Sequence, residues 1–589
     1  MKRSICLILS IMMVLSVFAG CQRSIPVQTQ DPTTDSGTPQ ETTASQTSAA
    51  VLSAEKDAEL HADLQTRIDE ILNSETEIVH SATYVPGETY TGTAYYISND
   101  GNDDNDGLTP ETAWQTLKKV AEANGFLSET ILLKPGDAVF FRRGDIFRMK
   151  EIGWDPYLGD EAALYLNVDG VTYSAYGEGE KPIITESTEN GSGAEKWILV
   201  YEDDTGKKIW QYYRDMRDVS MIVLNDGEIF TTRIYEYYDE NGYISCEATG
   251  WHMHEDEGIE GVTLDDGLHS LEVSLVEDLT IISRPARLEP EVNWVNGEVG
   301  PLYLRCDQGN PGELYNSIEF TEYQLSGIVQ LRADTVVFDN ISFRCNGSAY
   351  MKCSGESGAW KEIANTVIQN CEFAYGGGSV THYWEAESGA TFVGAQGDGI
   401  YNIVRNTLIQ NNYFHDSMLP VVTYEGDDFE DKDTVDGYYH FQDNICVNTM
   451  GIRLDSSADA LKHLDSVKVC GNQAWNTGRM DNGKYVYSEG SLVLMPNNYG
   501  ECIVADNVFY GTENGHPMNA LLDIFLYDFE EAGYTRPQFQ NNTYIQYTGR
   551  NFGDFLMQGS EAWAMDDPEL LKKAADLLGD TTSKFYVVE

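Results

Sequence analysis

One motif recurs through the C-terminal half of the chain and limits its fold more than any other feature. It is six residues long. The first residue is apolar, the third is Asn, Asp or Gly, the fourth is usually Asn, and the sixth is apolar or aromatic, while the second and fifth vary. The seven copies are Phe338–Phe343, Ile368–Phe373, Ile409–Phe414, Phe441–Cys446, Val469–Ala474, Val504–Phe509 and Phe539–Tyr544. Successive copies start 28 to 41 residues apart. This spacing is too short for a domain and is typical of one coil of a repeat fold.

The central residues of each copy explain how the chain turns. Pairs such as Asn411–Asn412 and Asp506–Asn507 are of types that tolerate the left-handed backbone region. Asn amides in successive coils can hydrogen-bond along a ladder. The predicted fold class is therefore all-β, a right-handed parallel β-helix with Phe343, Phe373 and Phe414 stacked in one column. The alternative, a β-sandwich with Asn-rich turns, would be interrupted by hairpins about every 8–12 residues.

The first 21 residues have the pattern of a secretory signal peptide. The charged start Met1–Ser4 precedes the apolar run Ile5–Phe18, which is shorter than a membrane span, and small residues follow before Cys21. The junction is similar to a bacterial lipoprotein box, with Phe18 where that box usually has Leu or Val. The resemblance implies a lipid on Cys21 after cleavage. The alternative is a cleaved signal followed by an ordinary cysteine.

Composition divides the rest of the chain into segments. Residues 22–52, rich in Thr, Ser, Gln and Pro, are expected to form a disordered tether. Leu60, Leu64 and Ile68 recur at helical spacing, so residues 53–92 are expected to hold one amphipathic helix and a lead-in. The predicted body comprises an N-terminal cap with the first coils at 93–184, a β-rich insertion at 185–325, the repeats at 326–550 and a C-terminal cap at 551–589.

The charge of the chain limits its partners. It holds 95 Asp and Glu against 38 Lys and Arg, a formal net charge of −57. Nucleic acids and anionic lipid surfaces are therefore poor partners. The 35 Tyr and 10 Trp side chains supply flat surfaces suited to stacking on sugars. We expect a polysaccharide substrate, membrane contact through the lipid anchor alone, and a monomer on the extracellular face of a bacterial membrane.

The cysteines are expected to be mostly buried thiols. Ten cysteines include Cys6 and Cys21, which leaves eight in the body. Export permits disulfides. Cysteines on the inward side of a stacked core, such as Cys446 and Cys502, nevertheless behave as small apolar residues.

Three stretches between residues 95 and 184 carry a family resemblance. Tyr95–Leu117 has the pattern of a strand, a loop dense in Asp and Asn, and a short helix. Leu133–Arg148 has the pattern of two strands joined by a Gly-Asp turn, and Val171–Ile184 repeats it. With the Asn repeats, these stretches resemble secreted bacterial right-handed parallel β-helix proteins, a pectate-lyase-like family of carbohydrate-active lipoproteins. The resemblance implies the fold but leaves the chemistry open, because this class contains lyases, hydrolases and fibres.

Asn102–Gly107 is similar to the first half of a calcium-binding loop. Asn102, Asp104 and Asp106 place oxygen ligands at alternate positions. The twelfth position is Ala113 and not Glu, so the match is incomplete. Calcium is the one cofactor that the sequence suggests, and an Asn/Asp turn that caps the first coil is the alternative.

The motif is absent between about residues 185 and 325, where Trp and Tyr are frequent. We expect a β-rich insertion that serves as a sugar-binding wall or as a brace. The chain is expected to return to the repeats at Pro301–Cys306.

Catalytic residues are expected where long loops leave the repeat and acidic residues gather. The longest interruption contains Asp398, and the next coil carries Asp416 just after its turn. Alignment of the coils by their Asn residues places Asp398 opposite Ser417 or Met418. Because parallel strands lie about 4.8 Å apart, the two carboxylates would lie within about 5–9 Å, a range that covers both retaining and inverting glycoside hydrolysis. The alternative is that His415 and Asp416 close a turn.

Further side chains are expected near this pair. Coil alignment places Asn448 level with Asp416, and Arg453 level with Val421. The predicted substrate-binding residues are His382, Tyr383, Trp384, His415, Glu425, Arg453 and Glu489. If one member of the catalytic pair is wrong, the candidates to replace it are Glu385, Glu425 and Glu489.

Three functions remain open. Paired carboxylates and aromatic surfaces favour a glycoside hydrolase with a cleft along the β-helix. A calcium-dependent uronate lyase needs a Lys or Arg base and cations against the substrate carboxylate, and this region holds few cations amid excess acid. A glycan-binding surface protein or adhesin would bind a glycan without cleaving it.

Overall fold

Three parallel sheets form the body of the described chain, and we call them sheets I, II and III. Among the described residues they have ten, eleven and nine strands respectively. The predicted parallel pairing is confirmed, and the fold is mostly β. The computed structural model describes residues 48–126, 128, 130–152, 163–217, 219–238, 244–248, 277–283, 299–322, 327–347, 349–353, 363–377, 398–401, 406–417, 421–424, 437–449, 451–454, 463–477, 490–494, 498–513, 520–526, 535–555 and 564–589.

The strands of each sheet follow one another in reverse chain order, apart from β1. Sheet I consists of β38 (Gln538–Gln540), β35 (Asn498–Ala505), β32 (His463–Cys470), β29 (Tyr438–Gln442), β26 (Thr407–Gln410), β23 (Val367–Gln369), β20 (Val337–Asp339), β8 (Thr172–Tyr176), β5 (Ala138–Arg142) and β4 (Ala94–Ile97). Sheet II consists of β1 (Ala50–Val51), β41 (Lys584–Val588), β39 (Thr543–Tyr547), β36 (Val508–Tyr510), β33 (Gln473–Trp475), β30 (Ile445–Val447), β27 (Tyr413–His415), β24 (Glu372–Ala374), β21 (Ser342–Arg344), β9 (Ile183–Thr185) and β6 (Ile146–Arg148). Sheet III consists of β40 (Gly553–Asp554), β37 (Leu522–Ile524), β34 (Leu492–Leu494), β31 (Ile452–Leu454), β28 (Val422–Tyr424), β25 (Asp398–Tyr401), β22 (Ala349–Cys353), β19 (Val329–Leu331) and β7 (Leu164–Leu166).

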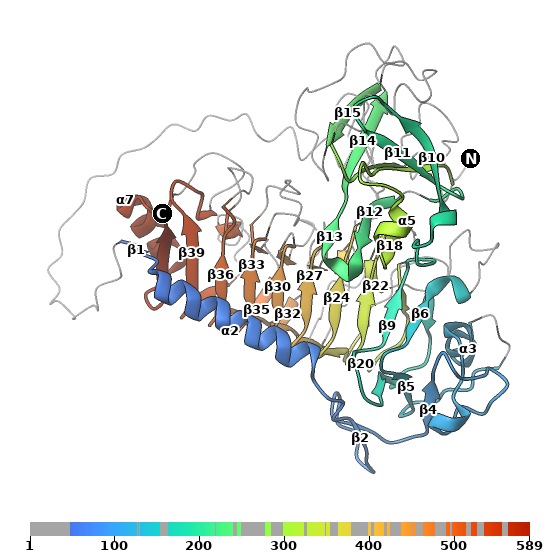
Figure 1. Cartoon of the computed structure of the whole chain (residues 1–589). Coiled ribbons are helices and arrows are strands. Elements are labelled where there is room, and N and C mark those ends of the chain that lie inside the picture. Colours follow the sequence, from blue (N-terminus) through green and yellow to red (C-terminus); the bar gives the residue numbers. More distant parts are fainter. Residues whose placement is uncertain are drawn as a thin grey trace, which may run out of the picture.

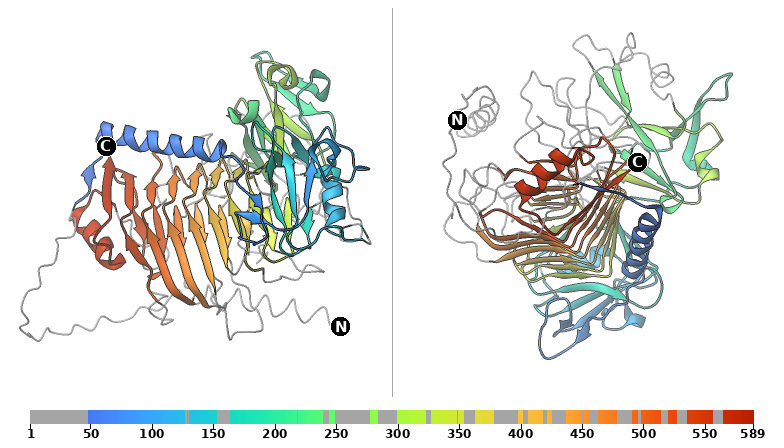
Figure 2. Two further views of the ribbon diagram at one scale, coloured as in Figure 1. Left: turned by 90° about the horizontal axis from the view of Figure 1, so that it is seen from below. Right: turned by 90° about the vertical axis from the view of Figure 1, so that its left-hand side faces the viewer.

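The chain visits the sheets in a fixed order. It passes from β20 in sheet I to β21 in sheet II and β22 in sheet III, and then returns to sheet I at β23. Figure 1 shows the strands side by side along the body, and the right-hand view of Figure 2 looks along the stack. One coil of the predicted repeat therefore contributes one strand to each sheet.

The aromatic column inside the stack is confirmed. Phe343 pairs with Phe373, and Phe373 pairs with Phe414, on neighbouring strands of sheet II. Their ring centroids lie 5.3 Å and 4.7 Å apart, with interplanar angles of 13° and 8°. All three rings are buried. The apolar residue that ends each copy of the motif therefore points into the core.

The predicted amide ladder is also confirmed. Nδ2 of Asn412 donates to Oδ1 of Asn444 at 2.9 Å, and the same contact links Asn444 to Asn472, Asn472 to Asn507 and Asn507 to Asn542. The residues just before the ladder positions adopt the left-handed backbone region where they are Asn or Asp, with φ between 53° and 58°. The ladder thus satisfies buried polar groups at the turn between sheets I and II.

A helix crosses the outward face of sheet II. The predicted amphipathic helix is α2 (Ala54–Leu72), which begins at the N-cap Ser53 and buries Leu60, Ile68 and Ile71. Leu60 packs against side chains of β33, β36 and β39, and Ile68 and Ile71 pack against β30 and β27. Figure 2 shows α2 alongside the strands. None of the helices in the described ranges is long and apolar enough to cross a membrane.

The remaining described α-helices are short or lie at the ends of the stack. The predicted short helix of the N-terminal cap is confirmed as α3 (Leu117–Ala123), with Thr116 as its N-cap. The C-terminal segment contains α7 (Pro568–Leu578), which is followed by β41 of sheet II. The insertion contains α5 (Pro311–Leu314).

The insertion leaves the stack after β9 and returns at β19. Its strands form one sheet of β10 (Trp197–Glu202), β11 (Lys208–Tyr212), β17 (Leu302–Arg305), β16 (Thr280–Ser283), β14 (Thr232–Tyr238) and β15 (Ile244–Ala248), and a second of β13 (Ile229–Phe230), β12 (Val219–Leu224) and β18 (Ile318–Glu322). The predicted return at Pro301–Cys306 is wrong, because β17 pairs antiparallel with β11 and β16. An apolar strand alone does not reveal which sheet it joins.

The cysteine prediction is confirmed where side chains are described. Cys306, Cys345, Cys371, Cys446 and Cys502 are free and buried. In the described segments these thiols fill the core as small apolar groups.

Candidate functional site

Two rows of outward-facing side chains on sheet II form a polar cluster. Ser342 pairs with Glu372 on one side of the aromatic column, and Ala374 pairs with His415 on the other. Because neighbouring parallel strands are in register, these side chains lie close together across successive coils. We call the group the His415 cluster, and it consists of Ser342, Arg344, Glu372, His415, Asp416 and Asn448.

Glu372 is the buried centre of the cluster. Its Oε2 accepts hydrogen bonds from the hydroxyl of Ser342 and from Nη2 of Arg344, the latter at 2.8 Å. Its Oε1 lies 3.1 Å from Nε2 of His415. Burial alone would raise the pKa of Glu372, but the charge of Arg344 and the hydrogen bond with His415 hold it well below its usual range. The surroundings of Glu372 therefore favour its charged form.

His415 bridges two carboxylates. Its Nδ1 lies 2.6 Å from Oδ2 of Asp416, on the side opposite Glu372. Burial alone would lower the pKa of His415, but the hydrogen bonds and charges of Asp416 and Glu372 raise it to about 9. A protonated ring donates from both nitrogens. The charges of Arg344 and His415 then balance those of the two carboxylates, which makes burial of the group tolerable.

Asp416 lies at the turn that follows β27. Its φ of 50° is left-handed, and the equivalent positions of the next two coils are Asn448 and Asn476, also left-handed. Nδ2 of Asn448 donates to Oδ1 of Asp416 at 2.9 Å. The alignment of Asn448 with Asp416 is confirmed. The turn explains why Asn or Asp stands at this position, but not why this coil carries the acid beside His415.

Aromatic rings hold the imidazole on both sides. Tyr413 stacks on His415 with centroids 4.2 Å apart and an angle of 17°, and Tyr375 meets it edge-on at 5.4 Å. The hydroxyl of Tyr375 donates to the carbonyl of Asp226 in the insertion at 3.1 Å. A Cβ on Gly227 would lie 2.3 Å from that hydroxyl. The insertion therefore packs against the cluster and fixes one wall of it.

Exposure distinguishes the two carboxylates. The side chain of Asp416 is 16% exposed, whereas that of Glu372 is 6% exposed and has donors on both oxygens. Both oxygens of Asp416 accept as well, from His415 and Asn448, and donors of this kind stabilise and orient a carboxylate. Asp416 is therefore the more exposed acid of the cluster, and His415 links it to Glu372.

The register corrects two sequence alignments. The predicted position of Asp398 opposite Ser417 or Met418 would pair Ile400 with residue 419 or 420, but Ile400 pairs with Val422. Arg453 pairs with Thr423 and not with Val421. Both errors have the same cause, since loops of different length precede the strands of sheet III.

The remaining predicted site residues are only partly described. The backbone of Asp398 begins β25, next to Ala349 of β22, and its side chain lies outside what the structure describes. The other predicted positions that lie outside the described residues are His382, Tyr383, Trp384, Glu385, Glu425 and Glu489, together with Cys21.

The acidic loop of the N-terminal cap is closed by its own hydrogen bonds. Oδ1 of Asn102 accepts from the backbone of Asp104, and Oδ1 of Asp106 accepts from the backbone of Leu108 and the hydroxyl of Thr112. No group of three His, Cys, Asp or Glu side chains in the described ranges is arranged to hold a metal ion. This geometry favours the capping turn over the calcium loop.

Arg344 and Glu372 were not predicted from the sequence. Each flanks the aromatic residue of a motif copy, as His415 does. When the copies are aligned by Phe343, Phe373 and Phe414, the side chains of Arg344, Glu372 and His415 all fall on the outward face of sheet II. Catalytic residues were expected in long loops, whereas Arg344 and Glu372 lie within strands.

Comparison with known proteins gives one similar curated sequence. No family model matches the chain. A lacto-N-biosidase from Bifidobacterium longum subsp. longum is 24% identical over 339 residues, which is 55% of this chain. The match spans 18% of the length of that relative.

Some solved structures show a partial likeness to the chain. A structure of XylC with xylose has a TM-score of 0.38 at 11% identity, covering 78% of this chain and 70% of that one. A GH136 lacto-N-biosidase from Eubacterium ramulus has a TM-score of 0.29 at 13% identity, covering 84% and 68%. A rhamnogalacturonan lyase has a TM-score of 0.33 at 10% identity, covering 78% and 76%.

Proposed function

We propose that this chain is a glycoside hydrolase built on a right-handed parallel β-helix. The observation that carries the proposal is Asp416, a partly exposed carboxylate oriented by His415 and Asn448. The similarity to a lacto-N-biosidase supports the same reaction class. The fixed order in which the chain visits the three parallel sheets supports the β-helix.

The proposed mechanism uses Asp398 and Asp416 as the catalytic pair. In the register of β25 and β28, Asp398 is level with residue 420 and not with residue 417 or 418, from which the separation of about 5–9 Å was expected. Asp416, with donors to both oxygens, suits the role of the charged nucleophile or base, and Asp398 is then the general acid that protonates the leaving oxygen. Since both nitrogens of His415 are bonded to carboxylates, we assign His415 to positioning Asp416 and not to binding the sugar. Substrate contacts are proposed for His382, Tyr383, Trp384, Glu425, Arg453 and Glu489.

The test is a panel of neutral and acidic polysaccharides, with a lacto-N-bioside included, digested by the wild type and by two variants. Asp416→Asn and Asp398→Asn are each expected to lose most of the turnover, by about 10²-fold or more, with unchanged circular dichroism. Asn448→Ala, which removes one donor to Asp416, is expected to lower turnover less. Wild-type rates in both Asp variants would show that the catalytic site is elsewhere. A wild type that binds glycans without cleaving them would favour the adhesin.

We further propose that the chain is held on the extracellular face of a bacterial membrane by a lipid on Cys21. The proposal rests on the signal pattern of residues 1–21. Metabolic labelling with a fatty-acid analogue is expected to mark the wild type and not Cys21→Ala. Equal labelling of the two would contradict it.

A further inference from the structure

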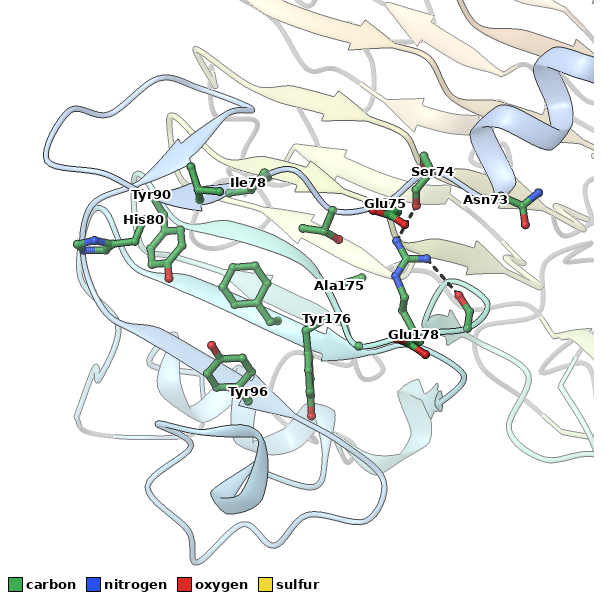
Figure 3. A pocket seen from close by; sticks show the side chains of 16 residues that line it. Asn73, Ser74, Glu75, Ile78, His80, Tyr90, Tyr96, Ala175, Tyr176 and Glu178 are labelled. Carbon is green, nitrogen blue, oxygen red and sulfur yellow. Dashed lines mark hydrogen bonds between the residues drawn. The ribbon is translucent and has the colours of Figure 1, made fainter.

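A groove lies at the N-terminal end of sheet I and shares no residue with the His415 cluster. It runs between residues 73–90, which follow α2, and the outward side of β4, β5 and β8 (Figure 3). The segment 73–90 includes the paired strands β2 (Val79–His80) and β3 (Thr89–Tyr90). The cavity volume of about 690 Å³ lies within the range of about 300–1,000 Å³ that is typical of small-molecule sites.

One end of the groove is aromatic. Tyr96 stacks with Phe140 at 5.8 Å and 27° and meets Tyr176 edge-on at 5.0 Å, while Tyr90 meets Phe140 at 5.6 Å. Tyr90, Tyr96 and Tyr176 are half-buried, and Figure 3 shows them together at one end with His80. The phenols of Tyr90 and Tyr96 form no hydrogen bond with any residue that the structure describes. Tyr90 and Tyr96 thus combine an apolar ring with a hydroxyl that has no partner among the described residues.

The other end of the groove is acidic. The exposed side chains of Glu75 and Glu178 line it and form no ion pair with the described residues. The buried guanidinium of Arg143 donates to the carbonyl of Ser74 at 2.7 Å and to Oδ1 of Asn340 at 3.0 Å, and its charge lies near those of Asp339 and Glu75. An anionic ligand would therefore meet two carboxylates beside a buried cation whose charge nearby acids already offset.

We propose that this groove binds a neutral oligosaccharide without cleaving it. Sugar rings would lie on Tyr96 and Tyr176, because pyranose faces are apolar and flat. Their hydroxyl groups would donate to Glu75 and Glu178, which accept hydrogen bonds only. The proposal goes beyond hydrolysis at Asp416 and does not depend on it. A second sugar site of this kind would hold a long glycan on the protein while another part of the glycan is cleaved.

The test is isothermal titration of the full chain with xylotetraose, cellotetraose, lacto-N-tetraose and tetragalacturonate. At least one neutral tetrasaccharide is expected to bind, and tetragalacturonate to bind more weakly. Tyr96→Ala is expected to weaken the neutral association about tenfold through loss of stacking. Tyr213→Ala is the matched control, since Tyr213 is 47% exposed and lies on the insertion; it is expected to leave the affinity unchanged.

A second variant, Glu178→Gln, keeps the proposal testable if the Tyr96→Ala protein does not fold. Glu178→Gln alters an exposed side chain, so it preserves the fold, and it is expected to weaken the neutral sugar severalfold. The proposal is overturned if none of the neutral sugars binds at millimolar concentration. It is also overturned if tetragalacturonate binds more tightly, or if the affinity falls in Asp416→Asn but in neither groove variant, which would place the bound sugar at the His415 cluster.

Discussion

Asn472→Ala tests the amide ladder in the middle of the stack. Asn472 is 1% exposed. Its Nδ2 donates to the carbonyl of Phe441 and to Oδ1 of Asn507, both at 3.0 Å, and its Oδ1 accepts from the backbone of Asn444 at 2.9 Å. Oδ1 of Asn472 also accepts from Nδ2 of Asn444 at 3.3 Å. Alanine removes all four hydrogen bonds and leaves the buried backbone N–H of Asn444 without an acceptor. With about 1 kcal/mol for each bond and about 1–3 kcal/mol for the donor left without an acceptor, the free energy of unfolding should fall by about 5–7 kcal/mol.

Urea denaturation followed by far-ultraviolet circular dichroism measures this loss. Asn316→Ala is the control, because Asn316 is exposed and its side chain forms no hydrogen bond with the described residues; it should change stability by less than about 0.5 kcal/mol. If Asn472→Ala costs no more than the control, the ladder does not stabilise the stack and the reasoning fails.

Three further predictions concern the core, the His415 cluster and the acidic loop. Phe414→Ala should lower the free energy of unfolding by about 3–5 kcal/mol, because the ring stacked on Phe373 leaves a cavity; a change below about 1 kcal/mol in urea titration would contradict the packed column. Since the pKa of His415 is raised to about 9 from 6.5, its contribution to stability is complete below about pH 6.5 and is lost as the pH rises through about 9. Midpoints of urea unfolding should show this fall in the wild type and a smaller one in His415→Gln. Because the oxygens of Asn102 and Asp106 are bonded within their loop, a chelator should leave the melting temperature unchanged, and a marked drop would restore the calcium site.

Local regularity made much of the stack predictable. Each copy of the motif carries its own turn residues and its own core residue, so Asn472 and Phe414 could be assigned contacts from position alone. The α2 helix was predictable for a similar reason, because its apolar spacing lies within one continuous segment. In both cases the determining signal is short in sequence.

Contacts that depend on loop length were not predictable. The register between β25 and β28 differs from the alignment because loops of very different length precede the two strands. The Asn positions do not show where strand pairing begins again after such a loop. β17 was assigned to the wrong sheet because pairing with β11 and β16 is not local. The link between Glu372 and His415 was visible in the aligned copies, yet its significance lies in burial and charge, which appear only when the coils are stacked.

The central claim is hydrolysis of a glycan by a site that contains Asp416. Its most direct test is digestion, in water enriched in oxygen-18, of whichever polysaccharide the panel identifies as substrate, with the products read by mass spectrometry. Hydrolysis incorporates one heavy oxygen at each new reducing end, and Asp416→Asn should abolish that incorporation. Products without heavy oxygen but with an unsaturated, ultraviolet-absorbing end would show elimination instead and would contradict the account.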